Sequence, residues 1–181
     1  MNQRQQDKHI RIKEMIIQGA KELIQENGYN RLSLRGIATR IGFAPASIYE
    51  YFTGKDDIID TVCTTIDQKL ASMLQETPDI IACCLAYIQF ARDNADDFQL
   101  LYHRELLGEY TEEVPLVFLA KLTEYHQQHV ALTLSMEVVS QAMWSTSHGL
   151  ALLSLHRNTN VDTHSLVLET LLHGFHAAPV V

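Results

Sequence analysis

Apolar side chains recur at helical spacing along almost the whole chain, and no stretch alternates strictly with the two-residue period of a strand. Ile12, Ile16, Ala20, Leu23 and Ile24 show the pattern on one face near the beginning. Apolar residues make up 46% of the 181 residues and charged residues 20%, a composition that can bury a core and is unlike that of disordered chains. We therefore predict an all-α protein.

Capping and breaking residues divide this pattern into about nine helices. Asn27-Gly28 ends the first helix, and Ser33 is placed as the N-cap of a short second helix over about 34–40. Pro45 suits the first turn of a third helix, and Gly54 separates that helix from a long fourth one. The later helices are predicted near residues 55–75, 79–93, 95–106, 113–133, 136–157 and 163–177.

The formal net charge of −8 is unevenly distributed along the chain. Residues 1–56 hold nine Lys and Arg against six Asp and Glu, a charge of +3, whereas the remainder holds five against sixteen, a charge of −11. Only the N-terminal part is suited to phosphate, because the acidic remainder would be repelled from it. A split of this size also arises on solvated helix faces, so the assignment depends on the motif.

The segment 31–58 places two short helices on either side of a tight turn at Gly42, which indicates a helix-turn-helix. The positions predicted to face inward are Ile37, Ala38 and Ile41 on the second helix and Ile48 and Phe52 on the third. The third helix then exposes a small, hydroxyl-rich set: Pro45, Ala46, Ser47, Tyr49 and Tyr51.

Small side chains at the start of a recognition helix let the backbone approach base edges, and hydroxyl groups can donate to phosphate oxygens. Lys55 opens the fourth helix, where its charge and the helix N-terminus together suit one phosphate. The alternative for Tyr49 and Tyr51 is ordinary packing between helices. The complete spacing of the segment favours the DNA-binding interpretation.

This segment resembles the TetR family of bacterial regulators, whose signature is an Ile-Ala pair, a Gly, a Tyr-x-Tyr/His-Phe block and a Lys. Here these are Ile37-Ala38, Gly42, Tyr49-Glu50-Tyr51-Phe52 and Lys55. The resemblance implies that Pro45 and Ala46 approach bases and that phosphates are contacted by Ser33, Ser47, Tyr49, Tyr51 and Lys55. We place Arg35 in the same DNA-binding set.

Two positions depart from the family pattern. Ala44 stands where a serine often caps the recognition helix, and Glu50 stands where Arg or His is common. A lost N-cap hydroxyl costs about 1 kcal/mol, and an acidic side chain near DNA lowers non-specific affinity. These departures bear on the strength and the base readout of DNA binding.

The later helices resemble, more loosely, C-terminal domains of the same family through Trp144 and His148-Gly149 and through the segment 87–105. The resemblance implies a homodimer in which the last two helices form a four-helix interface and DNA is read as an inverted repeat. Candidates for this seam are Leu150, Leu153, Leu166, Leu171 and Leu172, each of which also suits the core. The pool for a pocket holding a small, largely apolar effector is Tyr87, Phe90, Phe98, Tyr102, Phe118, Leu122, Trp144 and His148, and ordinary core is its alternative.

Other chemistry has little support in the sequence. The pairs His126/His129 and His173/His176 lack a completing Cys or carboxylate, so we expect no metal and no cofactor. Cys83 and Cys84 are predicted to be inert buried thiols, with a redox switch as the alternative. No phosphate loop, nucleophile elbow or zincin motif indicates an enzyme; a helical interaction protein without DNA binding is the stronger rival.

The predicted organisation is a helix-turn-helix DNA-binding domain over 1–54 and a helical effector-binding and dimerisation domain over 55–181. Nothing in the sequence resembles a secretory leader, and no apolar run reaches the length of a membrane span, so we expect a cytoplasmic protein. Members of the family are usually repressors released by their effectors, and the resemblance implies that function here.

Overall fold

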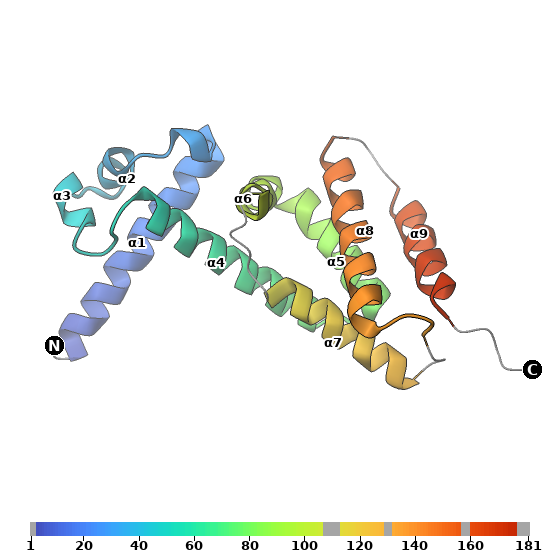
Figure 1. Ribbon diagram of the computed structural model, residues 1–181. Helices are drawn as coiled ribbons and strands as arrows, with labels where there is room; N and C mark the ends of the chain where they lie inside the picture. The colour runs from blue at the N-terminus through green and yellow to red at the C-terminus, as the bar shows by residue number, and fades with distance from the viewer. Residues whose placement is uncertain (1–2, 107–112, 129–131, 157–159, 177–181) are drawn as a thin grey trace, which may run out of the picture. The chain divides into compact units, whose positions relative to one another are not determined.

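The computed structural model describes residues 3–106, 113–128, 132–156 and 160–176, and it is helical as predicted (Figure 1). Over these residues the only β pairing is an isolated bridge between Leu132 and His176. The helices are α1 (Gln3–Asn27), α2 (Leu34–Ile41), α3 (Pro45–Ile48), α4 (Lys55–Gln75), α5 (Ile80–Asp93), α6 (Ala95–Leu106), α7 (Glu113–Gln128), α8 (Met136–His156) and α9 (Val161–Gly174), with a 3-10 turn, η1 (Tyr29–Arg31), after α1.

The chain divides into two compact units, an N-terminal unit over Met1–Ile66 and a C-terminal unit over Asp67–Val181. The division falls inside α4, whereas we predicted a domain boundary after residue 54, at the start of that helix. Buried apolar residues continue along α4 on both sides of the division, from Ile58 and Val62 to Leu70 and Leu74. One helix therefore contributes buried residues to both units.

The N-terminal unit is built from α1, η1, α2, α3 and the first part of α4. Helix α1 ends at Asn27 and is followed by Gly28, whose φ of 77° lies in the region that favours glycine. Helices α1 and α2 approach closely at Gly19, where an added Cβ would lie 2.7 Å from Cγ2 of Ile41. Glycine at this position allows α2 to lie against α1.

The C-terminal unit contains α5 to α9 and the end of α4. Helix α5 packs against α6, α7, α8 and α9, and α8 also packs against α7 and α9. The core of the C-terminal unit includes Phe98, Phe118, Leu122 and Met143. Lys121 of α7 donates from Nζ to the carbonyl oxygen of Thr77 at 2.7 Å, which fixes α7 against the turn that follows α4.

Most predicted helix limits agree with the structure within two residues, but α7, α9 and the short α3 end elsewhere. Helix α7 is described to Gln128, residues 129–131 lie outside the described part of the chain, and Leu132 and Thr133 are not helical although the helix was predicted to reach residue 133. Helix α9 begins at Val161, because the Asn160 side chain accepts from the backbone N–H of Asp162 at 2.9 Å and caps it earlier than predicted. It ends at Gly174, three residues before the predicted limit of 177.

Candidate DNA-binding surface and ligand pocket

The helix-turn-helix forms as the sequence predicts. Ser33 is the N-cap of α2, and its Oγ accepts from the backbone N–H of Gly36 at 3.1 Å. Gly42 ends α2 in the left-handed conformation, with φ 73° and ψ 31°, and the next N–H, that of Phe43, donates to the Ala38 carbonyl at 2.8 Å. The turn is therefore held by backbone hydrogen bonds that only a glycine makes without strain.

Helix α3 is regular only over Pro45–Ile48, shorter than predicted, and its N-cap residue, Ala44, makes no side-chain cap hydrogen bond. The backbone N–H of Phe52 still donates to the Ile48 carbonyl at 3.0 Å, which continues the turn. Ile48 and Phe52 are both buried, as predicted from their spacing of four residues. Their burial orients the outward side chains of the same segment.

The recognition face, defined as Pro45, Ala46, Ser47, Tyr49 and Tyr51, is open to solvent at every position. Tyr49 keeps 62% of its surface exposed, and Pro45 and Ala46 are exposed as well. Ser47 and Tyr51 are half-buried. The structure thus brings the predicted base-approaching and phosphate-contacting residues of α3 together on one accessible segment.

Tyr51 fits both roles considered for it, DNA contact and packing between helices. Its ring centroid lies 4.8 Å from that of His9 on α1, so it packs between elements as well as lying on the recognition face. Lys13 of α1 lies above the Phe52 ring, with Nζ 5.2 Å from the ring centroid. Helix α1 therefore supports the end of the recognition segment through an aromatic and a cationic side chain.

Ser33, Arg35 and Lys55 are the remaining predicted DNA contacts. Ser33 and Arg35 are exposed at the beginning of α2, and Lys55 is half-buried as the first residue of α4. Asp57 in the same turn of α4 accepts from both the backbone N–H and the hydroxyl of Thr53, at 2.8 and 3.1 Å. The sequence analysis missed this acidic cap, which offsets part of the positive field at Lys55.

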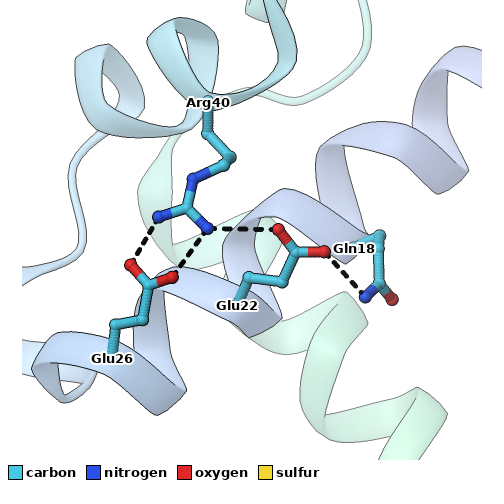
Figure 2. A network of polar contacts seen from close by, with 4 residues as sticks. All are labelled: Gln18, Glu22, Glu26 and Arg40. Carbon is cyan, nitrogen blue, oxygen red and sulfur yellow. Dashed lines mark hydrogen bonds and ion pairs between the residues drawn. The ribbon is translucent and has the colours of Figure 1, made fainter.

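A polar network between α1 and α2 holds one further arginine (Figure 2). Arg40 of α2 donates to Glu22 at 3.2 Å and makes a two-pronged contact with Glu26, both on α1, while Gln18 donates to Glu22 at 3.1 Å. The hydrogen bond to Arg40 lowers the pKa of Glu26, and the same contact raises the pKa of Arg40. Arg40 thus contributes to helix packing, and its partners lie 18 and 14 residues away, beyond any local sequence signal.

A pocket lies within the C-terminal unit and is lined from five helices. Its open cavity is about 10 Å³, the space of about one water molecule. Four of its lining residues, Tyr87, Phe98, Tyr102 and His148, come from the predicted effector pool. The others are Asp67, Leu70, Leu101, Val114 and Pro115.

His148 stands at the centre of an aromatic cluster in this pocket. Its Nδ1 lies 2.7 Å from the Tyr87 hydroxyl oxygen, and its ring centroid lies 5.4 Å from that of Phe98 and 5.3 Å from that of Tyr102. Trp144 lies one turn earlier in α8, and its ring centroid is 5.7 Å from that of His148. Burial lowers the pKa of His148, so its ring is neutral at physiological pH.

The remaining pool residues have other surroundings. Phe90, Phe118 and Leu122 are buried in the core and do not line the pocket, and Trp144 is not among the lining residues although its ring lies 5.7 Å from that of His148. Asp67 was not among the residues predicted to line a pocket, although its sequence position carries a signal. Asp67 is a carboxylate on the otherwise apolar stripe of α4, between Ile66 and Leu70.

The leucines predicted to form the dimer seam also differ from one another in exposure. Leu166 is 65% exposed and Leu153 is exposed as well, while Leu150 and Leu171 are half-buried. Leu172, by contrast, is only 2% exposed within its own chain, so it belongs to the core of the C-terminal unit. Exposed apolar side chains on α8 and α9 are the kind that a partner surface covers.

Among the described residues outside the pocket, His176 has a hydrogen-bond partner, and Cys83 and Cys84 are buried. Across the described ranges, no group of three or more His, Cys, Asp or Glu is placed to hold a metal ion. His176 Nε2 lies 2.9 Å from the Tyr125 hydroxyl, and His129 lies outside the described residues. Burial raises the pKa of both Cys83 and Cys84 to about 12. No helix in the described ranges has the length and apolar character to cross a membrane.

Two short helices that meet across a left-handed glycine and expose a small, hydroxyl-rich face define a helix-turn-helix protein. Family models identify the family of helix-turn-helix proteins to which the chain belongs. Residues 16–62 match the model described as bacterial regulatory proteins of the tetR family, and residues 80–175 match the tetracyclin repressor-like C-terminal domain. The chain belongs to the TetR family and is a DNA-binding transcriptional regulator.

Solved structures share this fold from end to end. A TetR-family regulator from Pectobacterium atrosepticum superimposes with a TM-score of 0.74 at 16% identity, over 96% of this chain and 98% of that one. A TetR/AcrR regulator from Thermobifida fusca gives 0.67 at 22% identity, over 91% and 98%. The regulator FadR from Bacillus subtilis, solved in complex with stearoyl-CoA, gives 0.59 at 22% identity, over 90% and 98%. No curated protein matches the sequence.

Proposed function

We propose that this regulator is a cytoplasmic repressor that binds an inverted-repeat operator as a homodimer and is released by a small, largely apolar effector. The observation that carries the proposal is the open recognition face on α3, with Tyr49 62% exposed, in a chain whose other unit contains an aromatic-lined pocket. DNA contact and ligand contact are thus assigned to different units of one chain. We propose no enzymatic activity for this chain.

DNA binding is assigned to the recognition face together with Ser33, Arg35 and Lys55. Pro45 and Ala46 are small enough for the backbone to approach base edges, and the hydroxyl groups of Ser47 and Tyr49 reach phosphate oxygens. A two-fold dimer presents two such faces to successive major grooves, about 34 Å apart. The exposed leucines of α8 and α9, Leu153 and Leu166, are proposed to be covered by the same helices of the second copy.

Release by an effector is assigned to α4. Asp67 and Leu70 on this helix line the pocket, and Lys55 at its beginning belongs to the DNA-binding set. A ligand that shifts α4 would change the separation of the two recognition faces, so its differential affinity for the two states lowers the affinity for the operator. A small-molecule ligand is also present in the FadR structure, a protein of the same fold.

The phosphate contacts can be tested with single substitutions and a charge-matched control. Lys55→Ala should weaken binding to a DNA duplex and lower the slope of log affinity against log salt by about 0.9, the value of one phosphate contact. Lys69→Ala removes the same charge from an exposed position of α4 in the C-terminal unit and should leave the slope unchanged. Tyr49→Phe removes only an exposed hydroxyl and should also weaken binding.

The comparison is measured by fluorescence anisotropy of a labelled duplex over a series of salt concentrations. Equal slopes for Lys55→Ala, Lys69→Ala and the unsubstituted protein would contradict the assigned surface. Unaltered affinity in Tyr49→Phe would remove this hydroxyl from the set of phosphate contacts.

A further inference from the structure

The charged side chains that line the pocket are of one sign only. Asp67 places a carboxylate in the lining and is itself only 4% exposed. None of the described lining residues is a lysine or an arginine. A carboxylate offers about four acceptor positions, so any partner that Asp67 has within the chain leaves others for a ligand. The polar side of the pocket therefore favours a donor over an acceptor.

The aromatic residues of the pocket also favour a positively charged ligand. Tyr87 and Phe98 meet edge to face with their ring centroids 5.5 Å apart, and the ring centroid of Tyr102 lies 5.3 Å from that of His148. The faces of such rings carry partial negative charge and attract cations within about 6 Å. His148 adds no positive charge at neutral pH, because burial lowers its pKa.

The charge of the whole C-terminal unit reinforces this local preference. Residues 67–181 hold five Lys and Arg against fourteen Asp and Glu, a formal charge of −9. An acidic body concentrates cations near its surface and repels anions. An effector with an anionic head would meet this field first and the buried Asp67 afterwards.

We infer that the effector is an apolar molecule carrying a positively charged nitrogen, which Asp67 holds in the pocket against the rings of Tyr87 and Tyr102. The inference rests on the proposed function, because it gives the chemical class of that same effector. The open cavity of about 10 Å³ is too small for such a molecule, so binding displaces side chains of the wall. Leu101 and Tyr102 are among the half-buried members of the wall, whereas Asp67, Leu70, Tyr87, Phe98 and Val114 are buried.

Three ten-carbon probes that differ only in the head group test the charge preference at pH 7.5: decylamine, decanol and decanoate, each below the concentration at which it forms micelles. Trp144 is the only tryptophan of the chain and lies 5.7 Å from His148, so its fluorescence reports binding. We expect decylamine to bind at least tenfold more tightly than decanol and decanoate. Equal or tighter binding of decanol or decanoate overturns the inference, and so does a failure of decylamine to bind.

The contribution of the carboxylate is tested with Asp67→Asn, which keeps the shape and removes the charge. The affinity for decylamine should fall at least tenfold, while that for decanol should stay within twofold. Asp60→Asn is the matched control, because Asp60 is exposed on the same helix, and it should bind decylamine like the unsubstituted protein. Equal decylamine affinity in Asp67→Asn and Asp60→Asn overturns the inference; if Asp67→Asn does not fold, the ranking of the three probes decides alone.

The outcomes separate this inference from the proposed function. If decanoate or decanol binds more tightly than decylamine and releases DNA, the pocket remains an effector site and only its charge preference is wrong. If none of the three probes alters either the Trp144 emission or DNA binding, the inference is wrong and the pocket loses its support as the effector site.

Discussion

Substituting Gly19 by alanine tests how α1 and α2 hold the DNA-binding unit together. The new methyl carbon would lie 2.7 Å from Cγ2 of Ile41, whereas carbon atoms pack at about 3.5–4.0 Å. Ile41 cannot rotate this group away, because a β-branched residue in a helix has essentially one χ1 rotamer. The two helices must therefore separate by on the order of 1 Å at their contact.

The expected net effect is a loss of about 1 kcal/mol from the free energy of unfolding of the N-terminal unit. Overpacking costs about 1–3 kcal/mol, and the better helix propensity of alanine returns about 1 kcal/mol. A loss of 1 kcal/mol lowers the melting temperature of a unit this size by about 4–8 °C. Gly149→Ala is the matched control, because nothing lies within 4 Å of its added Cβ and only the propensity gain remains.

Both variants are compared by thermal denaturation and by hydrogen exchange of the α2 amides. Gly19→Ala should melt at a lower temperature and exchange faster in α2, whereas Gly149→Ala should melt at an equal or higher temperature. An equal gain in stability for the two substitutions would show that the close approach at Gly19 does not constrain the unit.

Three further predictions concern other parts of the molecule. Cys83 and Cys84, with pKa values of about 12, should resist iodoacetamide at pH 8.5 in the native protein and react on unfolding, as read by peptide mass spectrometry. Because these thiols stay protonated when folded and ionise earlier when unfolded, stability should decline as the pH rises from about 9 toward 12; a rise would refute their burial. Leu166→Asp should shift the sedimentation coefficient from dimer to monomer, and Leu116→Asp, an equally drastic change at an exposed site on α7, should not. Ser33→Ala should cost about 1 kcal/mol of stability and weaken DNA binding in anisotropy titrations, and unchanged stability would argue against the cap.

Local sequence signals were enough to predict the helix-turn-helix. Ser33 caps α2, Gly42 ends it in the left-handed conformation, and Ile48 and Phe52 are buried, all as their residue types and spacings indicated. Each of these features depends on residues within about one helical turn, where propensity and capping act. The family resemblance then gave the recognition face its expected role.

Contacts between residues far apart in the sequence could not be predicted from such local signals. The contact between Arg40 and the glutamates of α1 joins helices whose approach depends on the tertiary fold, and helical spacing does not specify it. Similarly, aromatic residues at helical spacing are core more often than pocket lining, and the spacing alone did not distinguish Phe90, which is buried in the core, from Phe98, which lines the pocket. Asp67 could have been found from the sequence, since a carboxylate on a buried stripe calls for an explanation.

Selection from a randomised duplex pool at two salt concentrations, followed by sequencing of the retained DNA, tests the proposed function most directly. The account predicts an inverted repeat whose half-sites are about one helical turn apart, with recovery falling steeply at the higher salt concentration. Absence of any enriched sequence at low salt would contradict operator binding by the recognition face.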